Sequence, residues 1–195
     1  MTNPPIKAVF LDRDGTLNID INGYIRTPDE FELFPFAGKS VKLLNDLGYK
    51  VIVVTNQSGV ARGYYTQDDV NAIHDKMYKN LAKDGAKIDK LNYSPYHIEG
   101  KVEPFNINSE CRKPSLGMFK KAVEDFKLRP EHSWMIGDRY TDIAFGSKAG
   151  MKTILLLCGL GKKEFMEDRD NWTVMPDYIV EDLWAAVQLI ETLQA

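Results

Sequence analysis

Short runs of apolar residues alternate along this chain with segments in which apolar residues recur every three or four positions. The short runs are typical of buried strands and the three-to-four spacing is typical of amphipathic helices. Strands are expected at Ala8–Leu11, Val51–Thr55, Lys90–Tyr93, Ser133–Ile136, Lys152–Leu157 and Tyr178–Val180. Helices are expected at Gly38–Leu47, Gln67–Lys83, Ser115–Phe126, Thr141–Ala149 and Asp182–Leu193. This alternation predicts an α/β fold with a mostly parallel central sheet.

Residues at the ends of the expected helices support these boundaries. Thr66 and Ser115 stand where N-caps belong, and Gly48 and Gly150 stand where helices should stop. The charged run from 162 to 171, KKEFMEDRDN, indicates a solvated loop. His74 lies inside a helical pattern, where a structural role is the more common one.

Length and composition indicate one globular domain, residues 1–195, with loops 18–35 and 93–114 longer than a simple connection requires. The net charge of −3 gives no reason to expect a nucleic acid or an anionic membrane as partner. Two cysteines, Cys111 and Cys158, cannot build a disulfide framework. The N-terminus shows no signal-peptide pattern and no stretch approaches a membrane span, so we expect a cytoplasmic protein.

Polar clusters follow the ends of three expected strands. Asp12 and Asp14 follow the first strand, residues 55–58 (Thr-Asn-Gln-Ser) follow the second, and residues 137–142 (Gly-Asp-Arg-Tyr-Thr-Asp) follow the fourth. A fourth polar pair, Arg112-Lys113, ends the second long loop. Because ligands of parallel sheets bind beyond the carboxyl ends of the strands, we expect these groups to converge.

The chemistry of this cluster points to phosphoryl transfer. Asp12 and Asp14 can both face the crevice while Arg13 points away, since alternate residues of an extended segment share a face. Together with Asp138 and Asp142 they would repel one another unless a divalent cation such as Mg²⁺ were bound. Lysine, arginine and threonine would then suit an anion, and one carboxylate would attack phosphorus while the other handles the proton of the leaving group.

Taken singly, these residues have plainer explanations. An isolated Asp-x-Asp-Gly is usually a turn whose carboxylates bond their own backbone, and an isolated Asp138 could cap the next helix. Chance would have to place all of the groups at one strand edge, which makes the plain explanation improbable for the set.

The motifs FLDRDGTLN, VVTNQSG, RKP and IGDRYTD resemble the four ordered motifs of the haloacid dehalogenase-like (HAD) superfamily, across residues 7–160. The resemblance implies a Rossmann-like three-layer fold without a large cap domain, as in capless subfamily III. It implies Asp12 as nucleophile, Asp14 as general acid and base, and Thr55 and Lys113 as phosphate stabilisers. Mg²⁺ would be held by Asp12, the backbone carbonyl of Asp14 and Asp138, with Asp142 as a weaker, indirect contributor.

DRDGTLNID, GYI, VVTNQSGVARGYYT and CRKPSLGM further resemble the heptose-bisphosphate phosphatase and histidinol-phosphate phosphatase group. The resemblance implies substrate contacts within Asp20–Tyr24, although this segment carries one extra residue. The expected substrate-binding residues are Asn18, Asp20, Tyr24, Asn56, Gln57, Ser58, Arg112 and Arg139.

The group often folds its long loop around zinc with a Cys-x-His…Cys-x-Cys pattern, which this chain lacks. The corresponding residues read Ser-Pro-Tyr at 94–96 and Ser-Glu-Cys at 109–111, and His97 lies one place too late. A structural zinc site needs four nitrogen or sulfur ligands. We therefore expect no zinc, and expect Tyr93, Tyr96 and Phe105 to anchor the loop by packing.

The leading hypothesis is a monomeric, Mg²⁺-dependent phosphatase that removes the 7-phosphate of D-glycero-D-manno-heptose 1,7-bisphosphate, in carbohydrate metabolism that serves lipopolysaccharide biosynthesis. Alternatives with the same chemistry are histidinol phosphate, another small phosphate ester, or a phosphate on a macromolecule. A catalytically silent binding module ranks last because every catalytic position is filled.

Overall fold

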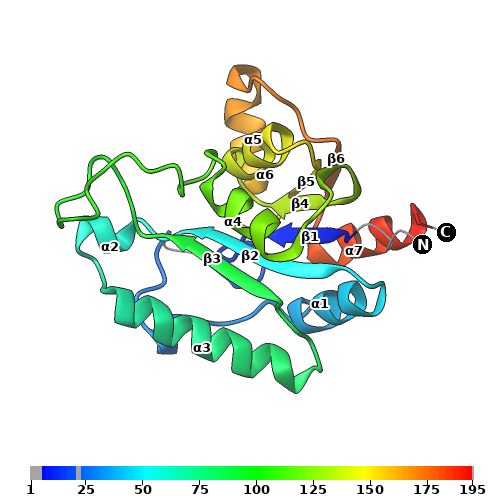
Figure 1. Cartoon of the computed structure of the whole chain (residues 1–195), viewed down its shortest axis with the longest axis horizontal. Helices are drawn as coiled ribbons and strands as arrows, with labels where there is room; N and C mark the ends of the chain where they lie inside the picture. Colours follow the sequence, from blue (N-terminus) through cyan, green and yellow to red (C-terminus); the bar gives the residue numbers. More distant parts are fainter. Residues whose placement is uncertain (1–5, 21–22, 195) are drawn as a thin grey trace.

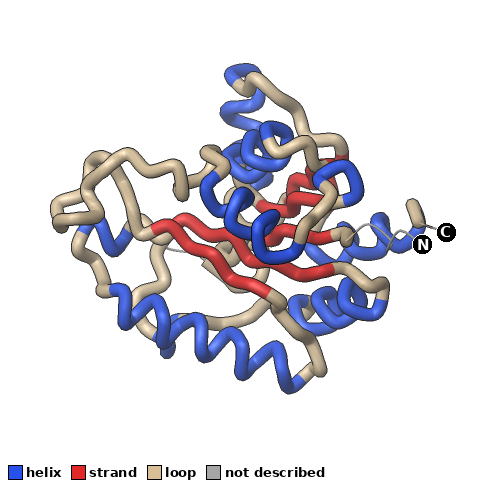
Figure 2. Tube along the Cα trace, in the orientation of Figure 1, coloured by secondary structure: helices blue, strands red, loops and turns tan. Residues whose placement is uncertain are grey.

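A computed structural model describes residues 6–20 and 23–194 of the chain. In this part of the chain six strands form one sheet in the order β3-β2-β1-β4-β5-β6, with every neighbouring pair parallel (Figures 1 and 2). The strands are β1 Ala8–Leu11, β2 Lys50–Asn56, β3 Lys90–Ser94, β4 Trp134–Gly137, β5 Lys152–Leu156 and β6 Tyr178–Val180. All six expected strands are present, with ends shifted by no more than one residue.

Helices cover both faces of the sheet and confirm the predicted α/β fold. One face carries α1 (Ala37–Asp46), α3 (Gln67–Lys83) and α7 (Leu183–Thr192), which lie below the sheet in Figure 1. The opposite face carries α4 (Gly117–Phe126) and α5 (Tyr140–Lys148). The shorter elements are α2 Gly59–Arg62, α6 Gly161–Asp168, η1 Pro28–Glu30, η2 Pro130–His132 and η3 Arg169–Asn171.

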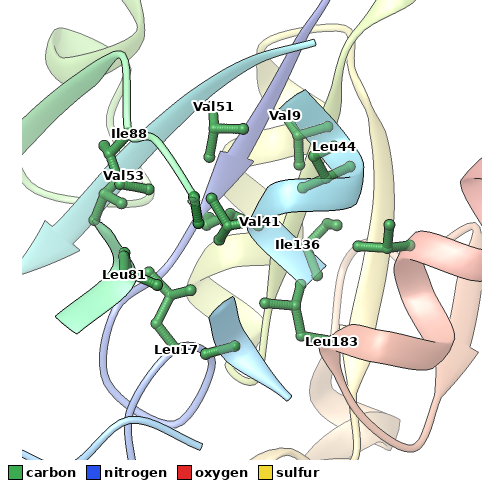
Figure 3. Packing of buried hydrophobic residues seen from close by; sticks show 14 of the residues in the cluster. Val9, Leu17, Val41, Leu44, Val51, Val53, Leu81, Ile88, Ile136 and Leu183 are labelled. Carbon is green, nitrogen blue, oxygen red and sulfur yellow. The ribbon is translucent and has the colours of Figure 1, made fainter. Parts of the chain in front are cut away.

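The central strands are apolar on both faces because both faces are covered. In β1, Val9 and Leu11 pack into the core beneath α1, α3 and α7, whereas Ala8 and Phe10 pack into the core beneath α4 and α5. All four side chains are fully buried. Figure 3 shows the first of these cores, in which Val9 lies among branched aliphatic side chains from β2, β4 and the covering helices. Burial on both faces explains why these strands are continuous apolar runs.

The helix-end predictions hold at three of four positions. Thr66 caps α3 by accepting a hydrogen bond from the backbone amide of Asp69, while the Asp69 carboxylate accepts from the backbone amide of Thr66. Gly48 and Gly150 follow their helices with φ of 79° and 76°, in the left-handed region where glycine is favoured. The prediction for Ser115 was wrong, because the preceding residues form a tight turn and α4 begins only at Gly117.

The solvated loop predicted for residues 162–171 was also wrong, because this segment forms most of α6 followed by η3. Its charged side chains do face outward, as expected. Phe165, however, packs edge-on against Trp172 at 5.8 Å between ring centroids, and Glu164 binds Arg139. These contacts of Phe165 and Glu164 attach the helical segment to the rest of the protein.

The two long loops remain mostly irregular and no further domain is inserted into residues 6–20 and 23–194, as the capless architecture requires. The loop from 93 to 114 lies beside α2 in Figure 1, where the Ala61 carbonyl accepts hydrogen bonds from the amides of Lys101 and Val102. None of the described helices combines the length and the apolar character that crossing a membrane requires.

Candidate active site

The carboxyl ends of β2, β1 and β4 lie side by side and deliver the predicted polar groups to one pocket. Leu11 of β1 pairs with Val53 of β2 and with Ile136 of β4, so the residues that follow emerge together. The pocket encloses about 170 Å³. Its lining residues are Asp12, Asp14, Asp20, Gly23, Tyr24, Thr55, Asn56, Ser58, Tyr65, Arg112, Lys113, Asp138, Arg139, Thr141 and Leu160.

A tight turn after β1 shapes the floor of the pocket. The Arg13 carbonyl accepts hydrogen bonds from the amides of Leu17 and Asn18, and Gly15 adopts φ of 78°. A β-carbon on Gly15 would lie 2.2 Å from Oδ2 of Asp138. The position therefore requires glycine both for its backbone conformation and for the close approach of Asp138.

Lys113 lies between two buried carboxylates. Its Nζ is 3.0 Å from Oδ1 of Asp12 and 2.6 Å from Oδ1 of Asp142, and it donates a 2.7 Å hydrogen bond to the Val54 carbonyl. Burial alone would favour the neutral amine, but the two carboxylates raise the pKa of Lys113 above its ordinary value. The lysine is thus held charged beside Asp12, with all three of its donors engaged.

The carboxylates of Asp12, Asp138 and Asp142 form a group that fits a divalent cation. One oxygen from each lies within 4.8 Å of the others, and all three side chains are buried. Oδ2 of Asp138 accepts from the Leu160 amide at 2.8 Å, but Oδ1 is buried without a hydrogen-bond partner among the described residues. Such an orphaned, clustered carboxylate oxygen is what an oxygen-preferring ion such as Mg²⁺ would bind.

Burial raises the pKa of two carboxyls in this group. Burial, with a smaller contribution from Asp12 and Asp142, raises the pKa of Asp138 well above its usual range. Burial also raises the pKa of Asp142 to about 7, even though Lys113 acts in the opposite direction. Both shifts have the direction expected of carboxyls that are buried beside other carboxylates, and a divalent cation bound among them would act in the opposite direction.

Asp14 is held by two neighbours that lie behind the pocket. Arg13 donates from Nε to Oδ1 of Asp14 at 2.9 Å and from one terminal nitrogen to Oδ2 at 2.8 Å. Gln57 donates from Nε2 to Oδ2 of Asp14 at 2.8 Å and to Oγ1 of Thr55 at 2.9 Å. As expected, Arg13 does not line the pocket, but its pairing with Asp14 was not foreseen.

The structure brings most of the expected substrate-binding residues to the pocket wall. These are Asp20, Tyr24, Asn56, Ser58, Arg112 and Arg139. Asn18 and Gln57 are buried and do not line it; Asn18 donates to the Ile19 carbonyl at 3.1 Å. Within the Asp20–Tyr24 segment, residues 21 and 22 lie outside the described residues.

Sequence reasoning missed three larger side chains of the wall, Tyr65, Thr141 and Leu160. Tyr65 donates from its hydroxyl to Oε1 of Gln57 at 3.0 Å, and burial raises the pKa of this phenol. Thr141 stands between the predicted residues Arg139 and Asp142, so its position in that motif was the available signal. Nothing in the local pattern of Leu160 indicates a site.

Two guanidinium groups add positive charge to the pocket. Arg112 donates to the Tyr96 carbonyl at 3.3 Å, and burial lowers its pKa from the ordinary value. Arg139 forms an ion pair with Glu164 at 2.6 Å. Because the carboxylates of Asp12, Asp138 and Asp142 are buried whereas both arginines are at least partly exposed, the pocket offers groups for a cation and groups for an anion.

The second long loop is anchored by aromatic packing, as predicted. The rings of Tyr96 and Phe105 lie 6.0 Å apart, and Tyr93 and Phe105 pack against the cluster of Val60, Tyr65 and Val70. Across residues 6–20 and 23–194, the group around Asp12 is the one set of three or more acidic, histidine or cysteine side chains placed to share a metal ion.

Comparison with known proteins gives a consistent result. Residues 110–186 match the HAD-hydrolase-like family. The chain is 37% identical over 190 residues to the D-glycero-beta-D-manno-heptose-1,7-bisphosphate 7-phosphatase of Pasteurella multocida, covering 97% of this chain and 99% of that protein. It is 43% identical over 152 residues to the protein of the same name from Haemophilus ducreyi, covering 77% of this chain and 82% of that protein.

Solved structures are similar over nearly the whole chain. D,D-heptose 1,7-bisphosphate phosphatase from B. bronchiseptica, crystallised with magnesium and phosphate, superposes with a TM-score of 0.83 at 28% identity, covering 96% of this chain and 99% of that one. A putative HAD-like phosphatase from Mesorhizobium loti superposes with a TM-score of 0.80 at 32% identity, covering 97% of this chain and 88% of that one.

Proposed function

Because this chain belongs to the HAD-like family of phosphatases, we propose that it hydrolyses the 7-phosphate of D-glycero-D-manno-heptose 1,7-bisphosphate through an aspartyl-phosphate intermediate. The observation that carries the chemistry is the Asp12–Lys113–Asp142 arrangement beside Asp138 and Asp14 in one pocket. The names of the relatives support the substrate.

Asp12 is placed to act as the nucleophile. Its Oδ1 accepts hydrogen bonds from the Arg13 amide and from Lys113, which leaves Oδ2 to attack phosphorus. A bond forms between this oxygen and phosphorus as the bond between phosphorus and the ester oxygen breaks, and Asp14 gives its proton to that departing oxygen. Asp14 then takes a proton from water, whose oxygen attacks phosphorus and releases Asp12 and inorganic phosphate.

Asp12, Asp138 and the backbone carbonyl of Asp14 would hold Mg²⁺, while Asp142 acts mainly through Lys113. When bound, the ion supplies positive charge that screens the carboxylates from the phosphate. Lys113 adds a second positive charge at Oδ1 of Asp12, the carboxylate oxygen that does not attack phosphorus. Thr55, held by Gln57, presents its hydroxyl at the same wall.

A bisphosphate explains why the pocket contains more positive charge than one phosphate needs. Arg112 and Arg139 both line the pocket and suit a second phosphate. Asp20, Asn56 and Ser58 offer hydrogen-bonding groups for sugar hydroxyls between the two ends. The relatives include enzymes named for either anomer, so the anomer belongs among the variables of the test.

The test is phosphate release in the presence of Mg²⁺ from both anomers of the heptose bisphosphate, histidinol phosphate, nucleotides and phosphopeptides. We expect the heptose bisphosphate to have the highest kcat/KM, and Asp12→Asn to abolish turnover while retaining the folded circular-dichroism spectrum. Asp46→Asn, an exposed carboxylate on α1, is the matched control. A clear preference for another ester would overturn the substrate, and near-parent turnover by Asp12→Asn would overturn the nucleophile.

We further propose that the chain acts as one domain, residues 1–195, whose loops 18–35 and 93–114 shape the pocket. We expect a monomer in the cytoplasm that binds a small phosphorylated substrate, with neither nucleic acid nor membrane as partner. The net charge of −3 supports the exclusion of nucleic acid. Sedimentation at working concentration tests the monomer.

A further inference from the structure

A buried polar pair lies behind Asp14, outside the pocket. The side chain of Arg13 is fully buried, and one of its terminal nitrogens lies 3.0 Å from Nε2 of His74, which is contributed by α3. His74 is buried as well, and its ring packs edge-on against Tyr93. An arginine buried this completely is uncommon and needs its donors satisfied.

The contact with Arg13 determines the state of the histidine. A guanidinium can only donate, so Nε2 of His74 must be the acceptor, and the ring is neutral with its proton on Nδ1. Burial, with a smaller contribution from the Arg13 charge, also lowers the pKa of His74, to about 3. His74 therefore serves as a fixed acceptor over the range in which the enzyme works.

The donors around Asp14 complete the arrangement. Oδ2 of Asp14 accepts from both Arg13 and Gln57, and Gln57 is itself held by the Tyr65 hydroxyl. Among the residues that the structure describes, Oδ1 of Asp14 accepts a hydrogen bond from Arg13 alone, so it keeps a lone pair for the transferred proton. The carboxylate is thereby clamped on both oxygens by groups that do not touch the pocket.

We propose that Arg13 and His74 are positioning residues: His74 orients the Arg13 guanidinium, and Arg13 orients the Asp14 carboxylate for proton transfer to the leaving group. The inference rests on the proposed function of Asp14 as general acid. The catalytic motif assigns no function to Arg13 or His74. If they position Asp14, a substitution of His74 should impair proton transfer to the leaving group and no other step.

Proton transfer can be separated from the other steps by varying the leaving group. An alkyl ester needs its departing oxygen protonated, whereas p-nitrophenolate is stable enough to leave with little help. Because kcat/KM reports events up to the first irreversible step, formation of the phosphoryl-Asp12 intermediate, the ratio of kcat/KM for the alkyl ester to kcat/KM for p-nitrophenyl phosphate measures the acid alone.

The experiment compares His74→Leu, which removes the acceptor, with His74→Gln, whose amide oxygen can still accept from Arg13. His74→Leu should lower the alkyl-to-aryl ratio by about tenfold, a fraction of the 10²–10⁴ that general acid catalysis supplies. His74→Gln should recover most of the ratio. Ile73→Val, a buried change in the adjacent residue of α3, should leave the ratio at the parent value. If His74→Leu does not fold, His74→Met takes its place.

The outcomes separate this inference from the proposed function. Equal losses on both esters, or no loss in His74→Leu, would overturn the positioning role. Asp14→Asn is measured in parallel, and an unchanged ratio in that variant would overturn the function of Asp14 itself. A lowered ratio in Asp14→Asn with a parent ratio in His74→Leu rejects only the inference about Arg13 and His74.

Discussion

Replacing Lys113 by methionine removes the one ammonium group buried among the site carboxylates. The lysine side chain is 1% exposed and satisfies Asp12, Asp142 and the Val54 carbonyl. Methionine fills a similar volume, so the change isolates the loss of charge and of three hydrogen bonds. Asp12 and Asp142 lose the ammonium group that they share, and each keeps a hydrogen bond from a backbone amide, that of Arg13 and that of Arg139 respectively.

The expected destabilisation is large for a single substitution. Removing one partner of a buried ion pair costs about 3–5 kcal/mol, chiefly because the remaining charge is uncompensated. Since burial already raises the pKa of Asp142 to about 7 in the presence of Lys113, its loss should raise that pKa further. A carboxyl whose folded-state pKa is raised contributes stability that is fully present below its unfolded pKa of about 3.9 and is lost as pH rises from there through the folded pKa. The deficit of Lys113→Met should therefore be greater at pH 8 than at pH 5.

The assay is urea unfolding followed by circular dichroism in EDTA, which removes divalent cations. Lys120→Met is the matched control: its ion pair with Glu110 at 3.2 Å is exposed on both sides, and such pairs contribute about 0–1 kcal/mol. Adding Asp142→Asn to Lys113→Met should recover part of the loss. A Lys113→Met deficit no greater than that of Lys120→Met, or one independent of pH, would refute the reasoning.

Three further predictions follow from local geometry. Gly15→Ala should lower the free energy of unfolding by about 1–2 kcal/mol for the left-handed backbone, and by an additional amount for the contact with Asp138. Gly48→Ala is the control, because Gly48 has φ of 79° and a β-carbon there would have nothing within 4 Å, so only the backbone part should be lost. Urea unfolding measures both variants. His74 is neutral in the folded state down to a pKa of about 3, so as pH falls below the unfolded value of 6.5 the parent should lose up to about 1.4 kcal/mol of stability per pH unit. Over the interval from pH 6.5 to 5 this amounts to about 2 kcal/mol, which His74→Gln should not lose. Elemental analysis of the purified protein should find no stoichiometric zinc, and one equivalent would contradict the packing account of the second long loop.

The fold was predictable because its strongest signals are local. β1 and β2 are covered on both faces, so their apolar runs are uninterrupted and leave few alternatives. The rule that parallel sheets present ligands at their carboxyl ends then placed Asp12, Thr55 and Asp138 together without any knowledge of distances. α6 was missed because its anchoring contacts, Phe165 with Trp172 and Glu164 with Arg139, do not form a helical pattern of apolar residues in the sequence.

The parts of the site that the sequence did not predict depend on side-chain conformation, which the backbone position alone does not determine. The alternation of side chains along the strand correctly predicted that Arg13 points away from the pocket. It could not predict that the Arg13 guanidinium binds the Asp14 carboxylate, or that His74 of α3 contacts the guanidinium. Gln57 was expected to contact substrate because the resemblance to the heptose-bisphosphate phosphatase group places residues 55–58 at the substrate. In the structure its amide bridges Thr55 and Asp14 instead. The contacts of Arg13 with His74 and of Gln57 with Asp14 link residues distant in sequence, which no periodicity encodes.

The charges of the site show why these hidden contacts matter for the metal. Arg13 neutralises Asp14 through two hydrogen bonds, so Asp14 adds nothing to the net charge of the buried group. That group contains three carboxylates, those of Asp12, Asp138 and Asp142, and one ammonium, that of Lys113. Two negative charges remain, which a single divalent cation would cancel. On the proposed mechanism, Arg13 would therefore separate two functions within one short motif: the Asp14 carboxyl would handle protons, while Asp12 and Asp138 would hold the ion.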